Sequence, residues 1–322
     1  MLKNYGHIPA GCEKLKPLLY PFYLSYPFKI WSKYRWWKNS NLSVSIRSLD
    51  KKRKWITVVN RLGAPGDTLI TSNVIRCIKL NYPKLKINCI TPHPELIRFD
   101  PTIDSVNQPE TFYSFDSTYW ELIDRKEKSQ NIVKHNMQRL GLDKNEYKAK
   151  FYLSEEEKEW AKQQISEFDK PLLAFCTKSK EPVKNWPEAN WLELIQNLKD
   201  KFSIIQLGND SEPRFDNVIR CAGKLSMRES AAILSNANYF IGPDSLLMHI
   251  ANGLNIQSVI IFGGSRSVNC FGYSENTNLS NNPECSPCWI HSTDGKCNES
   301  LKCLHNISVP TVFNSLMDMI NK

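Results

Sequence analysis

The sequence has no long apolar run. No stretch of about 18 uncharged apolar residues occurs among its 322 residues, so it contains no candidate transmembrane helix. The first ten residues include Lys3, His7 and Pro9, and they never build the apolar segment of about 7 to 15 residues that a secretory signal peptide needs. We therefore expect a cytoplasmic protein.

Acidic residues are scarce at the amino-terminal end of the chain. Residues 1–54 contain 12 lysines and arginines but only two acids, Glu13 and Asp50, whereas the remaining residues contain 30 basic and 31 acidic groups. Binding to nucleic acid requires basic side chains on the folded surface itself, so the balanced body of the chain argues against a nucleic acid partner. The positive charge belongs to an N-terminal extension.

This extension is also rich in aromatic residues. Nine of the 18 residues from Tyr20 to Trp37 are aromatic, and lysine and arginine are interleaved with them. Such a composition is typical of membrane interfaces and predicts a peripheral contact of residues 1–54 with an anionic membrane surface. The alternative is an arm that packs on the body and hides its aromatic rings. One long helix is not expected in either case, because prolines interrupt the segment at Pro17, Pro21 and Pro27.

The rest of the chain alternates short β-branched runs with helical patterns. One series begins at Trp55 and another after Asp169, and a capping box at Ser154–Glu157 opens a helix between them. Two such series predict two doubly wound α/β domains, at residues 55–168 and 169–322, with a boundary near residues 166–171. Because ligands of open parallel sheets bind at the carboxyl ends of the strands, we expect a site between these domains.

Neither of the common phosphate-binding loops follows the first strand. The turn there contains Gly63 and Gly66 at a GxxG spacing and lacks the Gly-Lys-Ser/Thr ending of a Walker loop. Asp67, at the start of the next helix, is placed where a carboxylate can take a proton from a hydroxyl group. An aspartate here also commonly caps a helix, and the spacing alone favours that simpler interpretation.

Two later turns also carry polar residues after a strand. Ser245 and His249, which follow Asp244, are four residues apart and share a helix face whose free amides suit a phosphate-bearing ligand. A helix cap with a buried histidine explains this pattern equally well. In the other turn, Gly263 allows close approach of a ligand and Arg266 can bind an anion, although a Gly-Gly pair also marks ordinary turns.

Taken together and in order, these motifs resemble those of glycosyltransferase family 9, the ADP-heptose:lipopolysaccharide heptosyltransferases. The resemblance covers roughly residues 55–315 and keeps the order and spacing of the family. Its motifs are Arg61–Asp67, Lys184–Pro187, Gly223–Glu229, Gly242–Ala251, Phe262–Gly263 and Cys285–Trp289.

The resemblance implies a GT-B fold of two Rossmann-like domains. The acceptor would lie on the first domain, beside the turn of Gly63 and Gly66, and the nucleotide-sugar donor on the second. The reaction would invert the anomeric centre and require no cofactor, with Asp67 as the base and Lys184 as the partner of the donor diphosphate. The donor pocket would contain Asp244, Ser245, His249, Gly263 and Arg266.

Other features of the sequence agree with this reaction, and two depart from the family. No two aspartates are two residues apart, so the DxD metal handle of GT-A transferases is absent. The charge of the leaving phosphate would instead be stabilised by Lys184, Arg266 and the helix amides near Ser245. Leu246 stands where the family usually has glycine, which puts the identity of the donor in question, and Asn73 stands where proline is common.

Four of the ten cysteines fall within 19 residues of one another. Four thiolates opened by a CxxC pair can enclose a structural zinc or iron ion. The alternatives are four free thiols or two disulfides, and a reducing cytoplasm disfavours the disulfides. The four are Cys285, Cys288, Cys297 and Cys303.

The sequence therefore predicts an inverting, heptosyltransferase-like enzyme of lipopolysaccharide biosynthesis. Its donor would be a nucleotide sugar, ADP-heptose by the family resemblance, and its acceptor a glycolipid or glycan hydroxyl at the cytoplasmic face of the membrane. The alternatives are another nucleotide sugar in the same site, an epimerase of the same fold, and a non-catalytic binding module. The joint presence of Asp67, Lys184 and His249 argues against the binding module.

Overall fold

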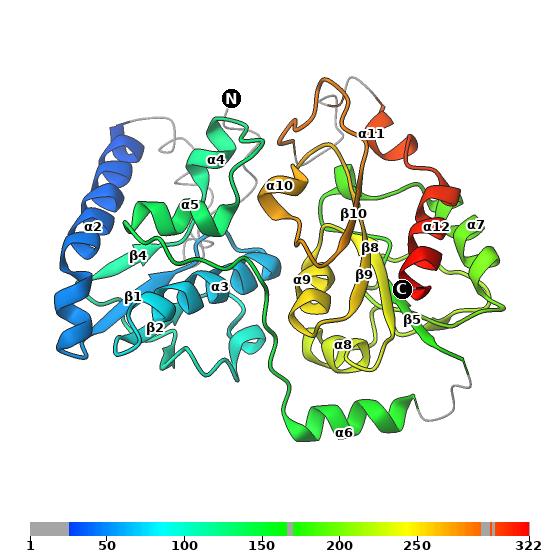
Figure 1. Cartoon of the computed structure of the whole chain (residues 1–322), viewed down its shortest axis with the longest axis horizontal. Helices are drawn as coiled ribbons and strands as arrows, with labels where there is room; N and C mark the ends of the chain where they lie inside the picture. The colour runs from blue at the N-terminus through cyan, green and yellow to red at the C-terminus, as the bar shows by residue number, and fades with distance from the viewer. Residues whose placement is uncertain (1–25, 166–169, 291–296, 298–299, 322) are drawn as a thin grey trace. The chain divides into compact units, whose positions relative to one another are not determined.

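The computed structural model describes residues 26–165, 170–290, 297 and 300–321, which divide into two compact units (Figure 1). The first unit holds the described chain up to Leu122 together with Gln130–Ala149, and the second holds Ile123–Ser129 and the described chain from Lys150 onward. Each unit is built on a parallel sheet, which confirms the α/β class. In the described ranges, no helix combines the length and the apolar character that crossing a membrane requires.

The first unit contains a four-stranded sheet in the order β3-β2-β1-β4. The first strand, β1, is buried along Ile56–Val59, because its apolar run lies at the centre of the sheet, where both faces are covered. Its strands are β1 (Trp55–Val59), β2 (Lys86–Ile90), β3 (Ser105–Val106) and β4 (Ser114–Asp116). Its helical elements are α2 (Tyr26–Lys51), α3 (Pro65–Asn81), η4 (Pro94–Ile97) and α5 (Ile132–Arg139), while α4 (Trp120–Asp124) spans the division between the units.

The second unit contains a six-stranded parallel sheet in the doubly wound order β10-β9-β8-β5-β6-β7. Its core lies between this sheet and the helices α7 and α12, where Trp186 donates a hydrogen bond from its indole nitrogen to the Ile307 carbonyl at 2.9 Å. The strands are β5 (Leu172–Phe175), β6 (Ser203–Gln206), β7 (Ile219–Arg220), β8 (Tyr239–Pro243), β9 (Gln257–Phe262) and β10 (Thr277–Ser280). The helical elements are α6 (Glu155–Gln164), η5 (Pro182–Lys184), α7 (Glu188–Leu198), α8 (Met227–Leu234), α9 (Leu246–Gly253), α10 (Val268–Phe271), α11 (Lys302–His305) and α12 (Val309–Ile320).

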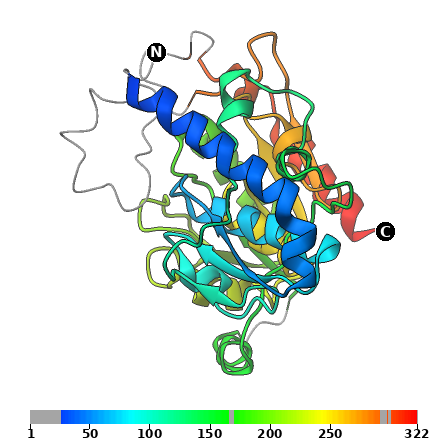
Figure 2. The ribbon, with the colours of Figure 1, turned by 90° about the vertical axis from the view of Figure 1, so that its left-hand side faces the viewer.

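Helix α2 corrects the expectation that prolines break the N-terminal extension into short pieces. It is a single helix of 26 residues, and it can include Pro27 because its first turn needs no amide donor from that residue. Pro17 and Pro21 lie outside the described residues. In the described part of its side chains, Leu42, Ile46 and Leu49 are buried, and α2 packs along β4 and α5 of the first unit (Figure 2). This part of residues 1–54 is therefore an arm packed on the body.

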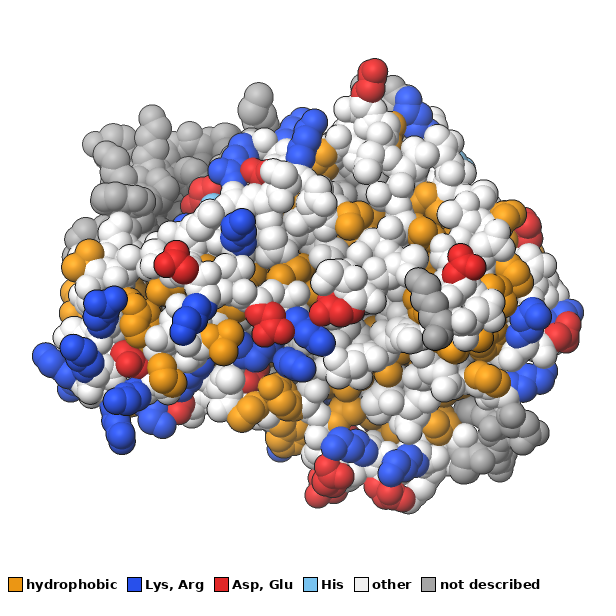
Figure 3. Space-filling model, in the orientation of Figure 1, with side chains coloured by type: hydrophobic (Ala, Val, Ile, Leu, Met, Phe, Trp, Pro, Cys, Tyr) orange, Lys and Arg blue, Asp and Glu red, His pale blue; other side chains and the backbone are white. Residues whose placement is uncertain are grey.

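Basic side chains remain exposed where α2 ends. Arg47 and the run Lys51–Lys54 are exposed, and Figure 3 shows lysine and arginine side chains gathered over this end of the first unit. Asp50 faces inward, where its carboxylate accepts hydrogen bonds from the amides of Lys84 and Leu85 at 2.7 and 3.1 Å. The segment thus combines a structural inner side with a positively charged outer side.

The chain crosses between the two units three times. It enters the second unit at Ile123, returns at Gln130, and leaves the first unit finally at Lys150. Backbone carbonyls hold the segment Ile123–Ser129 on the second unit. The Glu127 carbonyl accepts a hydrogen bond from the Trp289 indole at 3.3 Å, and the Lys128 carbonyl accepts one from the Ser267 hydroxyl at 2.5 Å.

The last crossing lies before the boundary that the sequence predicts near residues 166–171, of which 166–169 lie outside the described residues. The reason is that α6 packs on α8 of the second unit, where Arg228 binds Glu157 at 2.6 Å and covers the Phe151 ring. The capping box of Ser154 and Glu157 at the start of α6 is confirmed.

Candidate active site

The acceptor-side residues follow β1 in the first unit. The N-cap of α3 is Ala64, with Pro65 as the first helical residue, so Asp67 is not the capping residue that the simpler interpretation assumed. Its carboxylate instead accepts a hydrogen bond from the Tyr119 hydroxyl at 2.7 Å, and its side chain is partly exposed. A carboxylate at this position has the chemistry to take a proton from a substrate hydroxyl within hydrogen-bonding distance.

The turn before Asp67 depends on glycine. Gly63 has a φ of +82°, a left-handed conformation that a residue with a side chain rarely adopts, and its carbonyl lies 3.2 Å from Nε2 of His93. Gly66 is the second residue of α3. Asn73, one of the two departures from the family, is buried and donates to the Glu146 carbonyl at 2.8 Å, so it ties α3 to the chain that precedes the last crossing.

The donor-side residues meet in the second unit at the carboxyl ends of β5, β8 and β9. Lys184, at the end of η5, places its Nζ 2.8 Å from a carboxylate oxygen of Asp244, the residue that follows β8. Burial by itself lowers the pKa of the Lys184 ammonium group, but the carboxylates of Asp244 and Glu181 outweigh it and the pKa is raised. Lys184 is therefore a charged, largely buried cation, of the kind that can stabilise a phosphate.

Gly263 and Arg266 lie beside this cation. A Cβ on Gly263 would lie 2.7 Å from the Val183 carbonyl, so the η5 turn that carries Lys184 can approach only a glycine here. The Arg266 guanidinium is buried, lies 4.8 Å from the centroid of the Trp289 ring, and is 3.4 Å from Glu181. The Gly263–Gly264 turn therefore lets η5 and the loop that carries Arg266 pack closely together.

Ser245 and His249 belong to the start of α9. Ser245 is the N-cap residue of this helix, its side chain makes no capping hydrogen bond, and its hydroxyl lies 3.8 Å from Sγ of Cys176. His249 is buried, and its Nδ1 shares a hydrogen bond of 2.7 Å with the Tyr273 hydroxyl. Burial lowers the pKa of His249 to about 4, so its ring is neutral at pH 7. Leu246, the other departure, is the first residue of α9 and is partly exposed.

The depressed pKa of His249 predicts a loss of stability in acid. The unfolded chain takes up a proton near pH 6.5 that the folded chain excludes until about pH 4, so stability falls as the pH drops through this window. Between pH 7 and 5 the wild type should lose about 2 kcal/mol of unfolding free energy more than His249→Gln, which has no titrating ring. Urea unfolding at both pH values measures this difference. Equal losses in the two proteins would contradict the assignment of a neutral, buried imidazole.

The sequence does not single out several residues that the structure places at these sites. Tyr119 lies 52 positions from Asp67, and no local pattern connects them. Glu181 is three residues before Lys184, a spacing that could have indicated a pair. Glu212 is buried, and its carboxylate accepts from the amide and hydroxyl of Thr177 at 2.8 and 2.6 Å.

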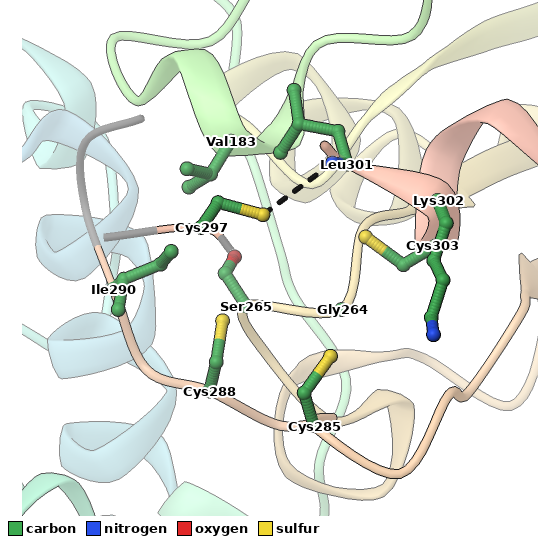
Figure 4. A pocket seen from close by; sticks show the side chains of 10 residues that line it. All are labelled: Val183, Gly264, Ser265, Cys285, Cys288, Ile290, Cys297, Leu301, Lys302 and Cys303. Atoms are coloured by element: carbon green, nitrogen blue, oxygen red, sulfur yellow. Dashed lines mark hydrogen bonds between the residues drawn. The ribbon is translucent and has the colours of Figure 1, made fainter. Parts of the chain in front are cut away.

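The four clustered cysteines line one small cavity beside the Arg266 loop (Figure 4). Figure 4 shows their sulfur atoms directed toward a shared space that Val183, Gly264 and Ser265 also border. Backbone hydrogen bonds of 3.0 Å join Cys288 to Gly264 and Trp289 to Ser265, so the cysteine segment supports the loop that carries Arg266. The cysteines are Cys285, Cys288, Cys297 and Cys303.

These cysteines do not form the predicted metal site in this structure. Within the described ranges, no three His, Cys, Asp or Glu side chains are grouped in a way that could hold a metal ion. Burial raises the pKa of the Cys288 and Cys303 thiols, so both are protonated in the absence of metal, and a metal ion bound here would have to displace these protons. The contacts of the cysteine segment support a structural role, because the segment holds the loop that carries Arg266.

Comparison with known proteins identifies the family. The sequence model of glycosyltransferase family 9 (heptosyltransferase) matches residues 120–297, more than half of the chain. Lipopolysaccharide heptosyltransferase 2 of Escherichia coli K12 is 26% identical over 129 residues, which are 35% of this chain and 37% of that protein. Lipopolysaccharide heptosyltransferase 1 of Pseudomonas aeruginosa is also 26% identical, over 37% of this chain and 36% of that protein. The chain thus matches only about a third of the length of these curated relatives.

Solved structures extend the likeness of the fold over most of the chain. The E. coli ADP-heptose heptosyltransferase II structure covers 83% of this chain and 98% of its own, with a TM-score of 0.60 and 14% identity. TibC, an iron-containing dodecameric glycosyltransferase from enterotoxigenic E. coli H10407, covers 83% of this chain and 76% of its own, with a TM-score of 0.66 and 18% identity. These similarities confirm the GT-B fold, and with the sequence match over residues 120–297 they show that the chain belongs to glycosyltransferase family 9, the heptosyltransferase family.

Proposed function

We propose that the protein is an inverting glycosyltransferase that transfers a sugar from a nucleoside diphosphate to a hydroxyl group of a glycolipid or glycan. The observation that carries the proposal is the largely buried, charged Lys184, whose Nζ lies 2.8 Å from Asp244, the residue directly before the N-cap Ser245 of α9. A cation and helix amides at one place suit a diphosphate leaving group. The names of the related heptosyltransferases support ADP-heptose as the donor and a lipopolysaccharide precursor as the acceptor.

In the proposed reaction each unit contributes one group to the chemistry. Asp67 accepts the proton of the acceptor hydroxyl as that oxygen attacks the anomeric carbon, and Tyr119 holds the carboxylate in position. Lys184 stabilises the negative charge that develops on the β-phosphate as the bond to the sugar breaks. None of these steps involves the cysteine cavity.

A panel of nucleotide sugars tests the function directly. The released nucleoside diphosphate is measured with and without a truncated lipopolysaccharide acceptor. Acceptor-dependent release of ADP from ADP-heptose supports the proposal. Release from another nucleotide sugar instead would indicate that Leu246, which replaces the usual glycine of the family, goes with a different donor. Release without acceptor indicates hydrolysis of the donor, whereas conversion of the nucleotide sugar to an epimer without net release indicates an epimerase. Failure to release any nucleotide would support the binding module and overturn the proposal.

The exposed basic side chains at the end of α2 support a place for the protein at an anionic membrane surface inside the cell. Arg47 and Lys51–Lys54 are exposed on the first unit, and each basic residue near such a surface contributes about 1 kcal/mol of attraction. Binding to this surface would bring the protein to an acceptor that is anchored in the membrane. Weakening of vesicle binding with rising salt is the expected sign of this attraction.

Replacing Lys184 by alanine should weaken binding of ADP by about 1.5 to 3 kcal/mol, the range for a hydrogen bond to a charged group. Adenosine, which has no phosphate, should bind the variant and the wild type equally, and this equality also reports that the variant is folded. Isothermal calorimetry measures both affinities. Lys201→Ala, which removes an exposed lysine of the same unit, is the control and should bind ADP normally. An equal loss for adenosine would place Lys184 outside the phosphate site.

A further inference from the structure

The donor side contains a row of four side chains with alternating charges. Arg266 lies 3.4 Å from Glu181, Glu181 lies 3.4 Å from Lys184, and Lys184 lies 2.8 Å from Asp244. The side chains are largely shielded from water, with exposed fractions between 6% and 17%. In the free protein, both cations therefore already have carboxylate partners.

The two carboxylates hold the cations unequally. Asp244 sits at the buried end of β8 and approaches Lys184 to the distance of a charge-assisted hydrogen bond, whereas Glu181 lies at a longer distance from both cations. Glu181 precedes the η5 turn and is the N-cap position of that turn, with no side-chain cap hydrogen bond. Of the two acids, Glu181 is thus the one with the longer contacts to the cations.

We propose that Glu181 is an internal counter-ion that occupies the Lys184 and Arg266 cations in the free enzyme and is displaced by the diphosphate of the nucleotide. This inference rests on the proposed function, because it concerns the same phosphate site. A diphosphate and the Glu181 carboxylate are both negative and compete for the same two cations. Glu181 therefore weakens the binding of nucleoside diphosphate and speeds its release after transfer.

This arrangement also explains why the protein can keep two cations close together. Arg266 by itself acts to lower the pKa of Lys184, while Glu181 acts to raise it. With Glu181 in place, the empty site is close to neutral, and both side chains are held ready without mutual repulsion. The carboxylate thus stabilises the free protein at the expense of affinity for the product.

The two roles that Glu181 could play predict opposite results for Glu181→Gln. If it is a competing counter-ion, the neutral side chain should tighten ADP binding by about tenfold and slow ADP dissociation in proportion. If it only positions Lys184, the same change should weaken ADP binding. Calorimetry and stopped-flow dissociation with ADP measure the two quantities, and adenosine affinity, expected to be unchanged, reports that the variant is folded.

Two further variants sharpen the test. Glu188→Gln removes an exposed carboxylate at the start of α7, seven residues further along the same segment, and should leave ADP affinity unchanged. Glu181→Asp draws the carboxylate back from the cations while keeping its charge, and should tighten ADP binding to a smaller extent than Glu181→Gln. It serves as the test if Glu181→Gln does not fold.

The outcomes separate this inference from the proposed function. Wild-type protein that binds no nucleoside diphosphate would overturn both. If the wild type binds ADP and Lys184→Ala loses that binding, but the Glu181 variants bind ADP equally or more weakly, the phosphate site stands and the counter-ion role is wrong. Tighter binding in both Glu181 variants, with Glu188→Gln unchanged, supports the inference.

Discussion

Replacing Asp67 by asparagine should lower turnover by about 10²- to 10⁴-fold, the usual contribution of a general base. The side chain keeps its size, and its amide oxygen can still accept the hydrogen bond from Tyr119 that the carboxylate accepts at 2.7 Å. The helix start should also be unaffected, because Ala64 and Pro65, and not Asp67, form it. Donor binding and the melting temperature should therefore change little.

Steady-state release of nucleoside diphosphate in the presence of acceptor measures this loss. Asp143→Asn, an exposed aspartate of the same unit, is the matched control and should turn over at the wild-type rate. If Asp67→Asn keeps near wild-type turnover, another group takes the proton and the assignment of the base is wrong.

Removing residues 1–50 should unfold the first unit. Leu42, Ile46 and Leu49 are at most 8% exposed, and burial of each such side chain contributes about 1.5 to 3 kcal/mol. Their combined loss is comparable to the whole stability of a typical protein, about 5 to 15 kcal/mol. The cut also removes Asp50, which holds the amides of Lys84 and Leu85 before β2. Circular dichroism and solubility of the truncated protein measure the effect.

Removal of residues 1–25 alone is the control for this truncation. It spares α2 and the exposed basic run Lys51–Lys54, so the shortened protein should fold, bind ADP and keep at least part of its salt-sensitive attraction to anionic vesicles. A stable, ADP-binding protein that lacks residues 1–50 would show instead that α2 is dispensable for the fold.

The sequence predicts the fold well because the signals for it are local. Apolar runs mark the buried strands β1, β5 and β9, and the capping box at Ser154 marks the start of α6. The interruption of α2 was the wrong part of this prediction. A proline at the start of a helix costs little, and the sequence does not show where the helix starts.

The contacts of the site are less predictable because they join residues that are far apart in the chain. Asp67 lies in α3 and Tyr119 in the loop between β4 and α4, and the pairing of Glu181 with Arg266 spans 85 positions. The same holds for the cysteines, whose spacing correctly suggested a cluster but carried no information on whether their thiols close around an ion. The family resemblance pointed to Lys184 and Asp244 as site residues, whereas the contact of Glu181 with Lys184 became visible only in the structure.

Because the chain passes between the two units three times, it restricts where chimeras with related proteins can be joined. A chimera joined only at residue 149 would take residues 123–129 from one parent and the surface that receives them from the other. The Trp289 indole and the Ser267 hydroxyl would then depend on a foreign segment for the carbonyl groups that they bind. An exchange of the second unit must therefore transplant Ile123–Ser129 together with the chain from Lys150 onward, as two inserts and not as one.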